Sequence, residues 1–434
     1  MILIHGGRLL TFTEEKPYID DGAIAVDGSV IKEIGSSKEL LAKYGDAEMI
    51  GAEGGVIMPA LVNAHTHICR ALGMGMPAPF LSGSYEQNEA RYAFDAKLDF
   101  DGMIESAYAL MTESVKNGVG CVIDMLTGVR DPRGILLVIA GIANDIGLRA
   151  CLGCGVTKRN GEEAFSAALG ENKGFAEYCR TYPSELIRPA FGVDLLYTLD
   201  DNDLYAILRA AEGRLPLQIS VSDGPDDVFY SKRSFGRLPV ERLNDLGLLT
   251  ENTVLAHCGC LCDKEAELIA ESGACAVHTP LSDELKDDLS PAFDKLIKLG
   301  APVGLGTDAL TSDALMLPRA AVHGLVGKVS DPFLVSVEML TKGCAVAASR
   351  IFGMPLGVLR PGAAADIIIM NYDPCTSFSV DNAHLHMLRA MSGAQCTFNM
   401  VNGRILMREG KLLTCTEKYC RIKTRAASER LWNK

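Results

Sequence analysis

Aromatic residues, charged residues and long apolar runs are all scarce in this sequence. Aromatic side chains make up 6% of the 434 residues, and charged side chains make up 22%. No apolar stretch reaches the roughly eighteen residues of a membrane helix, and the best one, Ile135 to Ala143, ends at polar residues. We therefore expect no membrane span. Hydrophobic residues amount to 48%, enough for a sizeable core of small aliphatic side chains.

Positive charge is also in short supply. The chain has 42 Lys and Arg against 55 Asp and Glu, a formal net charge of −13. Such a surface repels nucleic-acid phosphates and anionic membranes, so we expect a small-molecule substrate as the partner. The first residues, MILIHGGRLL, lack the cationic start of a secretion signal, and we expect a cytoplasmic protein. Its 14 cysteines are then expected to be free thiols.

The order of predicted elements indicates an α/β fold in three parts. Short strands fill residues 1–57, strands alternating with helices fill 58–352, and more short strands lie in 353–434. The alternation predicts parallel βαβ units, and eight strand candidates indicate a (β/α)8 TIM barrel. Neither terminal part has enough strands to be stable alone, so we expect both to join in one small β-sandwich. The barrel candidates are 56–63, 121–125, 149–156, 187–195, 217–222, 253–257, 274–278 and 303–306.

Candidate metal ligands follow the first and the last of these strands. His65 and His67 stand two residues apart at the end of a buried strand, so both side chains point to the same face. Asp308 follows the last strand, at the carboxyl-end face where barrel active sites form. Two imidazoles and a carboxylate on that face suit a divalent cation. The alternative, polar residues that end a strand and a turn, stays open for each residue taken alone.

Several segments carry a resemblance to the amidohydrolase superfamily. The main ones are PALVNAHTH (59–67), LAHC (255–258), VHTPLSD (277–283) and VGLGTDALTSD (303–313). They resemble the chlorohydrolase and aminohydrolase branch, which includes guanine and S-adenosylhomocysteine deaminases. The tail segments GAAAD (362–366) and VNGR (401–404) resemble its closing sheet. Similarity to aminohydrolases encoded beside selenium-dependent purine metabolism genes lies in GMPAP (75–79), VTKRNG (156–161) and VERLNDLGLL (240–249).

The resemblance implies a homodimer that holds one divalent metal ion, Zn, Fe or Mn. The implied ligands are the His-x-His pair and the acid after strand eight, with His257 on strand six as a further ligand or a holder of water. Family members add a third metal His on strand five and a proton-shuttling Glu three residues later. This chain has Ser220 and Asp223 there, and Asp194 where relatives present a His to the substrate. Because a serine hydroxyl is a poor ligand, metal is expected to bind weakly or not at all, with preference shifted toward Mn²⁺ or Fe²⁺.

With metal bound, the expected chemistry is deamination or ring opening at a C–N bond of a purine- or pyrimidine-like heterocycle. Asp308 is expected to accept the water proton, Asp223 to protonate the leaving nitrogen, and His257 to hold the water or substrate. Asp194 is expected to contact a ring N–H. The alternative is a catalytically degenerate barrel that serves as a binding or scaffold subunit, which Ser220 favours.

Further substrate contacts are predicted around the barrel mouth. The loop 73–95 is expected to cover the pocket. There, Arg70 and Arg91 either meet an anionic or carbonyl-rich substrate or form salt bridges within the lid. His278, at the end of strand seven, faces either the substrate or a structural hydrogen-bond partner. Cysteines also lie near the mouth, where inert thiols are the common outcome, at positions 151, 154, 258, 260 and 262.

Overall fold

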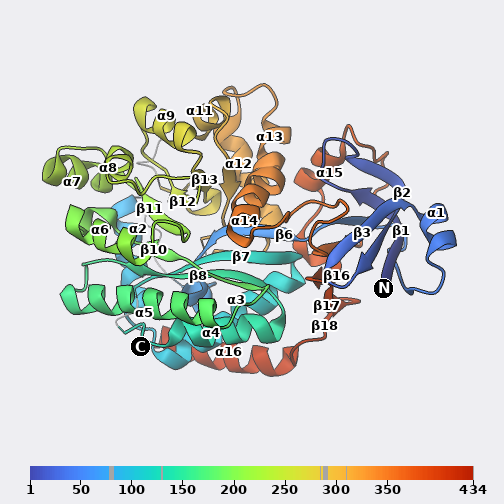
Figure 1. Ribbon diagram of the computed structural model, residues 1–434, viewed down its shortest axis with the longest axis horizontal. Helices are drawn as coiled ribbons and strands as arrows, with labels where there is room; N and C mark the ends of the chain where they lie inside the picture. Colours follow the sequence, from blue (N-terminus) through green and yellow to red (C-terminus); the bar gives the residue numbers. More distant parts are fainter. Residues whose placement is uncertain (78–82, 129–130, 284, 287–291, 309, 434) are drawn as a thin grey trace.

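The computed structural model describes residues 1–77, 83–128, 131–283, 285–286, 292–308 and 310–433 (Figure 1). These residues form a barrel, which fills the left of the view, and a separate sheet built from both chain ends on the right. The predicted α/β barrel fold is therefore confirmed. Among the described residues, we find no helix whose length and apolar character would suffice to cross a membrane.

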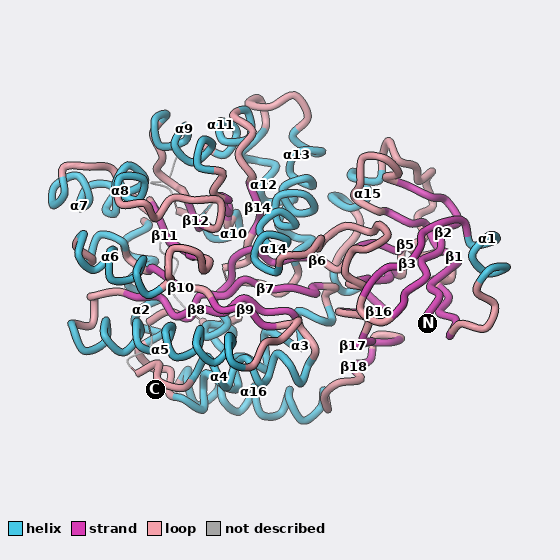
Figure 2. Tube along the Cα trace, in the orientation of Figure 1, coloured by secondary structure: helices cyan, strands magenta, loops and turns pink. Residues whose placement is uncertain are grey.

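The barrel is a parallel sheet with helices around it (Figure 2). Its strand order is β6-β7-β8-β10-β11-β12-β13-β14, with β9 paired to β8. Asn63 and Thr307 join the first strand to the end of the last, through Asn63 Nδ2 to Thr307 Oγ1 (2.8 Å) and Thr307 N to Asn63 Oδ1 (3.1 Å). The strands are β6 (Leu61–Thr66), β7 (Val119–Leu126), β8 (Arg149–Val156), β9 (Ile187–Pro189), β10 (Phe191–Val193), β11 (Leu217–Val221), β12 (Thr253–His257), β13 (Cys275–His278) and β14 (Val303–Leu305).

Helices on the outside of the barrel pack against a continuous aliphatic core. In chain order they are η1 (Ile68–Gly73), α2 (Ser84–Asp95), α3 (Phe100–Lys116), α4 (Ile135–Ile146), α5 (Glu162–Thr181), η2 (Leu196–Thr198), α6 (Asp201–Ala210), α7 (Pro225–Phe235), α8 (Pro239–Asp245), α9 (Asp263–Ser272), α10 (Pro280–Asp283), α11 (Phe293–Lys298), η3 (Ala314–Met316), α12 (Leu317–Leu325), α13 (Pro332–Glu338), η4 (Met339–Gly343) and α14 (Cys344–Phe352). The last helix, α16 (Glu417–Trp432), runs along α3 beneath the barrel.

The two chain ends share one sheet, as predicted. Its order is β18-β17-β16-β15-β5-β1-β2-β3, with β4 paired to β1. The sheet is mixed, because β1 runs parallel to β4 and β5 and antiparallel to β2. Its strands are β1 (Ile2–Leu10), β2 (Tyr18–Asp27), β3 (Val30–Ser36), β4 (Glu48–Gly51), β5 (Val56–Pro59), β15 (Ile367–Met370), β16 (Cys396–Val401), β17 (Arg404–Arg408) and β18 (Lys411–Leu412). Helices α1 (Ser37–Lys43), α15 (Ala383–Arg389) and η5 (Gly393–Gln395) accompany it.

The stretch 56–63 is two strands in two different sheets, so its prediction as a single barrel strand was wrong. Strand β5 pairs with β1 and β15, whereas β6 pairs with β7 in the barrel. The run is apolar throughout because it is buried in both sheets, which hid the break. Pro59, which has no N–H, ends the first strand. The predicted boundary after residue 57 thus falls inside β5.

The segment that begins after η1 is not the loop that the sequence analysis predicts. Residues 84–95 form helix α2, and residues 78–82 lie outside the described part of the chain. The sequence SYEQNEARYAFD contains good helix formers, with Glu86 in the first turn, and this signal was available. The turn-forming residues that precede this segment hid the start of the helix.

Candidate functional site

Four predicted metal ligands converge at the carboxyl end of the barrel strands. Ligand atoms of His65, His67, His257 and Asp308 lie within 4.8 Å of one another, and all four residues are buried. A Cβ on Gly306 would lie 2.7 Å from the Cβ of His65, so only glycine lets the end of β14 pass this close to β6. His257 (φ 72°) and Asp308 (φ 50°) have left-handed backbones, a strain of about 1–3 kcal/mol each that is typical of functional sites.

The imidazole rings are arranged as metal ligands. Both ring nitrogens of His65 are buried without a hydrogen-bond partner. His67 Nδ1 lies 2.7 Å from the carbonyl oxygen of Met125, which can only accept, so Nδ1 carries the proton. The lone pair of Nε2 then faces Asp308 Oδ1 at 3.1 Å. Two acceptors at this distance need a cation or a proton between them, and the donor set therefore fits a divalent ion.

Charge effects keep two of these donors, His65 and Asp308, in the form that binds a cation. Burial, followed by the neighbouring His67 and His257, holds the pKa of His65 well below its usual range, so this ring is neutral. Burial alone would raise the pKa of Asp308, but Arg91 and His67 outweigh it and hold the pKa well below its usual range. Arg91 Nη2 lies 3.0 Å from Asp308 Oδ2.

A second buried cluster adjoins the first through His257. Its Nδ1 lies 3.2 Å from Asp283 Oδ1 and 3.3 Å from Asp223 Oδ1. Lys286 Nζ, which is fully buried, lies 2.5 Å from Asp223 Oδ1. Burial would raise the pKa of Asp223, but His257 and Lys286 reverse this and keep the carboxylate ionised. Sequence reasoning missed Lys286 and Asp283, because nothing local distinguishes either residue from an ordinary helix or loop position.

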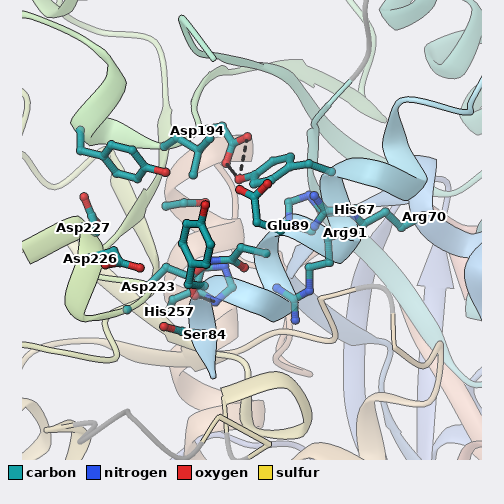
Figure 3. A pocket seen from close by; sticks show the side chains of 17 residues that line it. His67, Arg70, Ser84, Glu89, Arg91, Asp194, Asp223, Asp226, Asp227 and His257 are labelled. Atoms are coloured by element: carbon teal, nitrogen blue, oxygen red, sulfur yellow. Dashed lines mark hydrogen bonds and ion pairs between the residues drawn. The ribbon is translucent and has the colours of Figure 1, made fainter. Parts of the chain in front are cut away.

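A pocket opens above these clusters, lined by His67, His257, Ser220 and residues of α2 and α7. Figure 3 shows Asp226 and Asp227 on one side of it and Arg70 on the opposite side. Ser220 lies near the end of β11, and it occupies the position at which the sequence predicts serine in place of a third imidazole. His65 and Asp308 are not among the described residues that line the pocket, so the ligand cluster lies at its floor.

The predicted substrate contacts have different surroundings. Asp194 lines the pocket, and burial raises its pKa. Arg70 also lines it but makes a buried pair with Asp95, with Nη2 to Oδ2 at 2.7 Å, which matches the salt-bridge alternative. His278 lies on a neighbouring cavity, with Nδ1 3.1 Å from Asp283 Oδ2 and its ring against Phe293.

Three of the five cysteines near the mouth have the character of core residues. Cys151, Cys154 and Cys258 are buried, and burial raises the pKa of each thiol. Cys260 is half-buried and Cys262 is exposed. Thiols of raised pKa are protonated at neutral pH and are poor metal ligands or nucleophiles.

Comparisons with known proteins agree with this geometry. A family model described as "Amidohydrolase family" matches residues 56–412. The 5'-deoxyadenosine deaminase of Methanothermobacter thermautotrophicus is 28% identical over 437 residues, covering 99% of this chain and 98% of that protein. The 5-methylthioadenosine/S-adenosylhomocysteine deaminase of Thermococcus sibiricus is 27% identical over 390 residues, covering 88% of this chain and 89% of the other.

Solved structures share the fold. A zinc-bound adenosine deaminase from Xanthomonas campestris superposes with a TM-score of 0.89 at 20% identity, covering 100% of this chain and 99% of that one. The guanine deaminase of E. coli superposes with a TM-score of 0.80 at 17% identity, covering 94% and 100%.

Proposed function

Because the chain belongs to the amidohydrolase family and is a hydrolytic enzyme, we propose that it deaminates an aminopurine nucleoside with the help of a divalent metal ion. The observation that carries the proposal is the ligand cluster. His65 has two partnerless ring nitrogens, and the lone pair of His67 Nε2 faces Asp308 at 3.1 Å. The two relatives described above are named as deaminases of adenine-type nucleosides, which supports this substrate class.

Each residue of the ligand cluster has its own proposed role. A bound cation, held by His65, His67 and Asp308, would supply a hydroxide at neutral pH. Asp308 would accept the first proton of the attacking water. His257, fixed by Asp283 at 3.2 Å, holds the water in place.

The pocket carboxylates bind the heterocycle. Asp223 stays ionised beside Lys286, so it first accepts a hydrogen bond from a ring N–H or the amino group. Once the C–O bond has formed, it takes the second proton of the water and passes it to the leaving nitrogen, which departs as ammonia, while Asp308 returns the first proton to a ring nitrogen of the product. Because Asp is one methylene shorter than Glu, we propose that turnover is slow. Asp194 binds a second N–H of the substrate.

A second candidate function is a binding barrel without catalysis. Ser220 in place of an imidazole favours it, as does the ion pair between Arg91 and Asp308, which already neutralises one metal ligand. Homodimerisation and cytoplasmic residence stay predictions from the sequence.

Metal analysis and ammonia release separate the two candidates. The purified chain, loaded with Mn²⁺, Fe²⁺ or Zn²⁺ in turn, is assayed with 5'-deoxyadenosine, adenosine and guanine. We expect close to one metal ion per chain and ammonia release that is lost in His67→Ala. The variant His323→Ala, altered on the outside of the barrel, serves as the control and should keep both properties. Less than about a tenth of an equivalent of metal, or full metal content without ammonia, would reject the deaminase.

A further inference from the structure

One face of helix α2 contacts three candidate catalytic carboxylates at once. Asn88, Arg91 and Tyr92 are spaced three and four residues apart, so their side chains project from the same side of the helix. Each carboxylate comes from the end of a different barrel strand. The contacts are Asn88 Nδ2 to Asp223 Oδ2 at 2.8 Å, Arg91 Nη2 to Asp308 Oδ2 at 3.0 Å, and Tyr92 Oη to Asp194 Oδ1 at 3.4 Å.

Further contacts seat the helix on the barrel. Arg91 Nη2 also donates to Ser282 Oγ at 2.5 Å, and Gln87 Nε2 donates to the carbonyl oxygen of Leu285 at 2.9 Å. Both partners follow β13. The helix is therefore held to the ends of several strands, and Figure 3 shows the Tyr92 contact as the dashed lines that reach Asp194.

The space beneath this face is too small for a purine. The cavity has a volume of about 40 Å³, which holds a few water molecules. Ligand sites for molecules of nucleoside size have roughly 300 Å³ or more. A substrate thus enters only if α2 moves away from the carboxylates.

Arg91 also competes with a cation for Asp308. A guanidinium at 3.0 Å neutralises the carboxylate that a divalent ion would need, and its charge repels that ion. By thermodynamic linkage, the factor by which the ion pair weakens metal binding equals the factor by which bound metal weakens the ion pair.

We propose that α2 is a latch that blocks the site in the free chain, and we call Asn88, Arg91 and Tyr92 the latch face. Asn88 and Tyr92 occupy carboxylate oxygens that substrate N–H groups would use, and Arg91 neutralises the carboxylate of Asp308, so loading the site displaces the latch. A ligand that displaces the latch has to supply its own hydrogen-bond donors in place of those of the latch face. This requirement selects a heterocycle that carries an amino group over one that carries only hydrogen-bond acceptors. This inference rests on the proposed function, because it assigns the latch to that same site.

Metal affinity in the absence of substrate tests the latch. Isothermal titration with Mn²⁺ compares the full chain with Arg91→Gln, which removes the ion pair. We expect R91Q to bind about tenfold more tightly. Ser282→Ala, which removes only the second anchor of Arg91, should lie between the two. Arg133→Gln is the control: it removes an exposed cation that pairs with Asp131, at 2.6 Å, a residue that is neither part of α2 nor a metal ligand. Its affinity should stay within about twofold of the wild type.

Hydrogen exchange of α2 gives the second readout. Adding Mn²⁺ should speed amide exchange in residues 84–95 of the wild type and leave R91Q unchanged, since its latch is already released. Equal metal affinity in wild type and R91Q, or exchange in α2 that ignores metal, would overturn the latch and leave the proposed function standing. Absence of Mn²⁺ binding in both proteins would reject the metal-dependent function and the latch with it.

Discussion

Ser220 is the residue at which the ligand set is incomplete, and it can be tested by restoring the imidazole. It is the next-to-last residue of β11 and lines the pocket beside His67 and His257. Ser220→His should raise Zn²⁺ affinity about tenfold or more, because a third neutral nitrogen completes a tetrahedral set with the acid. Competition with a chromophoric chelator measures it. Ser220→Ala, which adds no ligand, should leave the affinity unchanged, and equal affinities for all three proteins would contradict the placement of residue 220.

Asp227 makes stability depend on pH. Burial raises its pKa to about 7, against the hydrogen bond from Ser222 N at 2.5 Å. An unfolded aspartate titrates near pH 4, so between pH 4 and 7 the folded carboxyl keeps a proton that the unfolded chain has lost. The free energy of unfolding therefore falls as the pH rises through this range.

Asp227→Asn should flatten this dependence, by an amount on the order of 3 kcal/mol between pH 4 and pH 7.5. Urea unfolding of both proteins at pH 4, 6 and 7.5 measures the difference. Parallel stability curves for wild type and D227N would show that Asp227 is already ionised in the folded chain.

At this scale the sequence predicted residues that stand at strand ends and missed residues that reach the site through tertiary contacts. His65, His67 and Asp308 were found because each ends or follows a predicted strand, and the carboxyl ends of parallel strands meet, whereas His257 came from the family resemblance. The pairing of Arg91 with Asp308 spans 217 positions of sequence and depends on how α2 docks, which no local pattern encodes. Lys286 is buried against Asp223 for the same reason.

Among the elements, α16 has a role that its distance in sequence conceals. Trp432, the single tryptophan, donates from Nε1 to the carbonyl oxygen of Leu72 at 2.8 Å. Leu72 belongs to η1, which directly follows His67. The end of the chain therefore fixes the turn that follows the His-x-His pair.

Trp432→Phe should loosen this turn while keeping most of the packing. The lost hydrogen bond costs about 1 kcal/mol, and amides of residues 68–73 should exchange faster in the variant. Hydrogen exchange read by mass spectrometry measures it, with amides of α9 on another part of the barrel as the internal control. Unchanged protection of 68–73 would show that α3 alone holds η1.

For the whole molecule, one buried ion pair joins the barrel to the terminal sheet. Arg149, at the start of β8, is fully buried and reaches Asp366 at 2.6 Å and Asn402 at 2.9 Å. Arg149→Met should lower the free energy of unfolding by about 3–5 kcal/mol, because Asp366 keeps a buried charge without its partner.

Thermal and urea unfolding measure this effect. Arg133→Met, which breaks an exposed pair with Asp131, is the control and should leave the melting temperature unchanged. Adding Asp366→Leu to R149M should recover part of the loss, since the unpaired charge is then gone. A double variant no more stable than R149M would place the cost elsewhere.

The overall fold was predictable because the alternation of strands and helices persists over some 290 residues. The point at which the chain passes from the terminal sheet to the barrel, between β5 and β6, was not predictable. An apolar run buried on both faces looks the same in either sheet, so 56–63 gave one strand. Only pairing partners distinguish β5 from β6, and every one of these partners lies 48 or more residues away in sequence.

Because the chain passes directly from the terminal sheet to the barrel, the two parts cannot be cut apart at this point. Between Pro59 of one sheet and Leu61 of the other stands Ala60 alone, and His65 follows only six positions after Pro59. A barrel that begins at Leu61 lacks β5, so β15 loses its neighbour. A barrel that begins at Val56 carries β5 as an unpaired strand next to its own active centre. Chimeras with relatives must therefore exchange both chain ends together with the barrel, or keep all three.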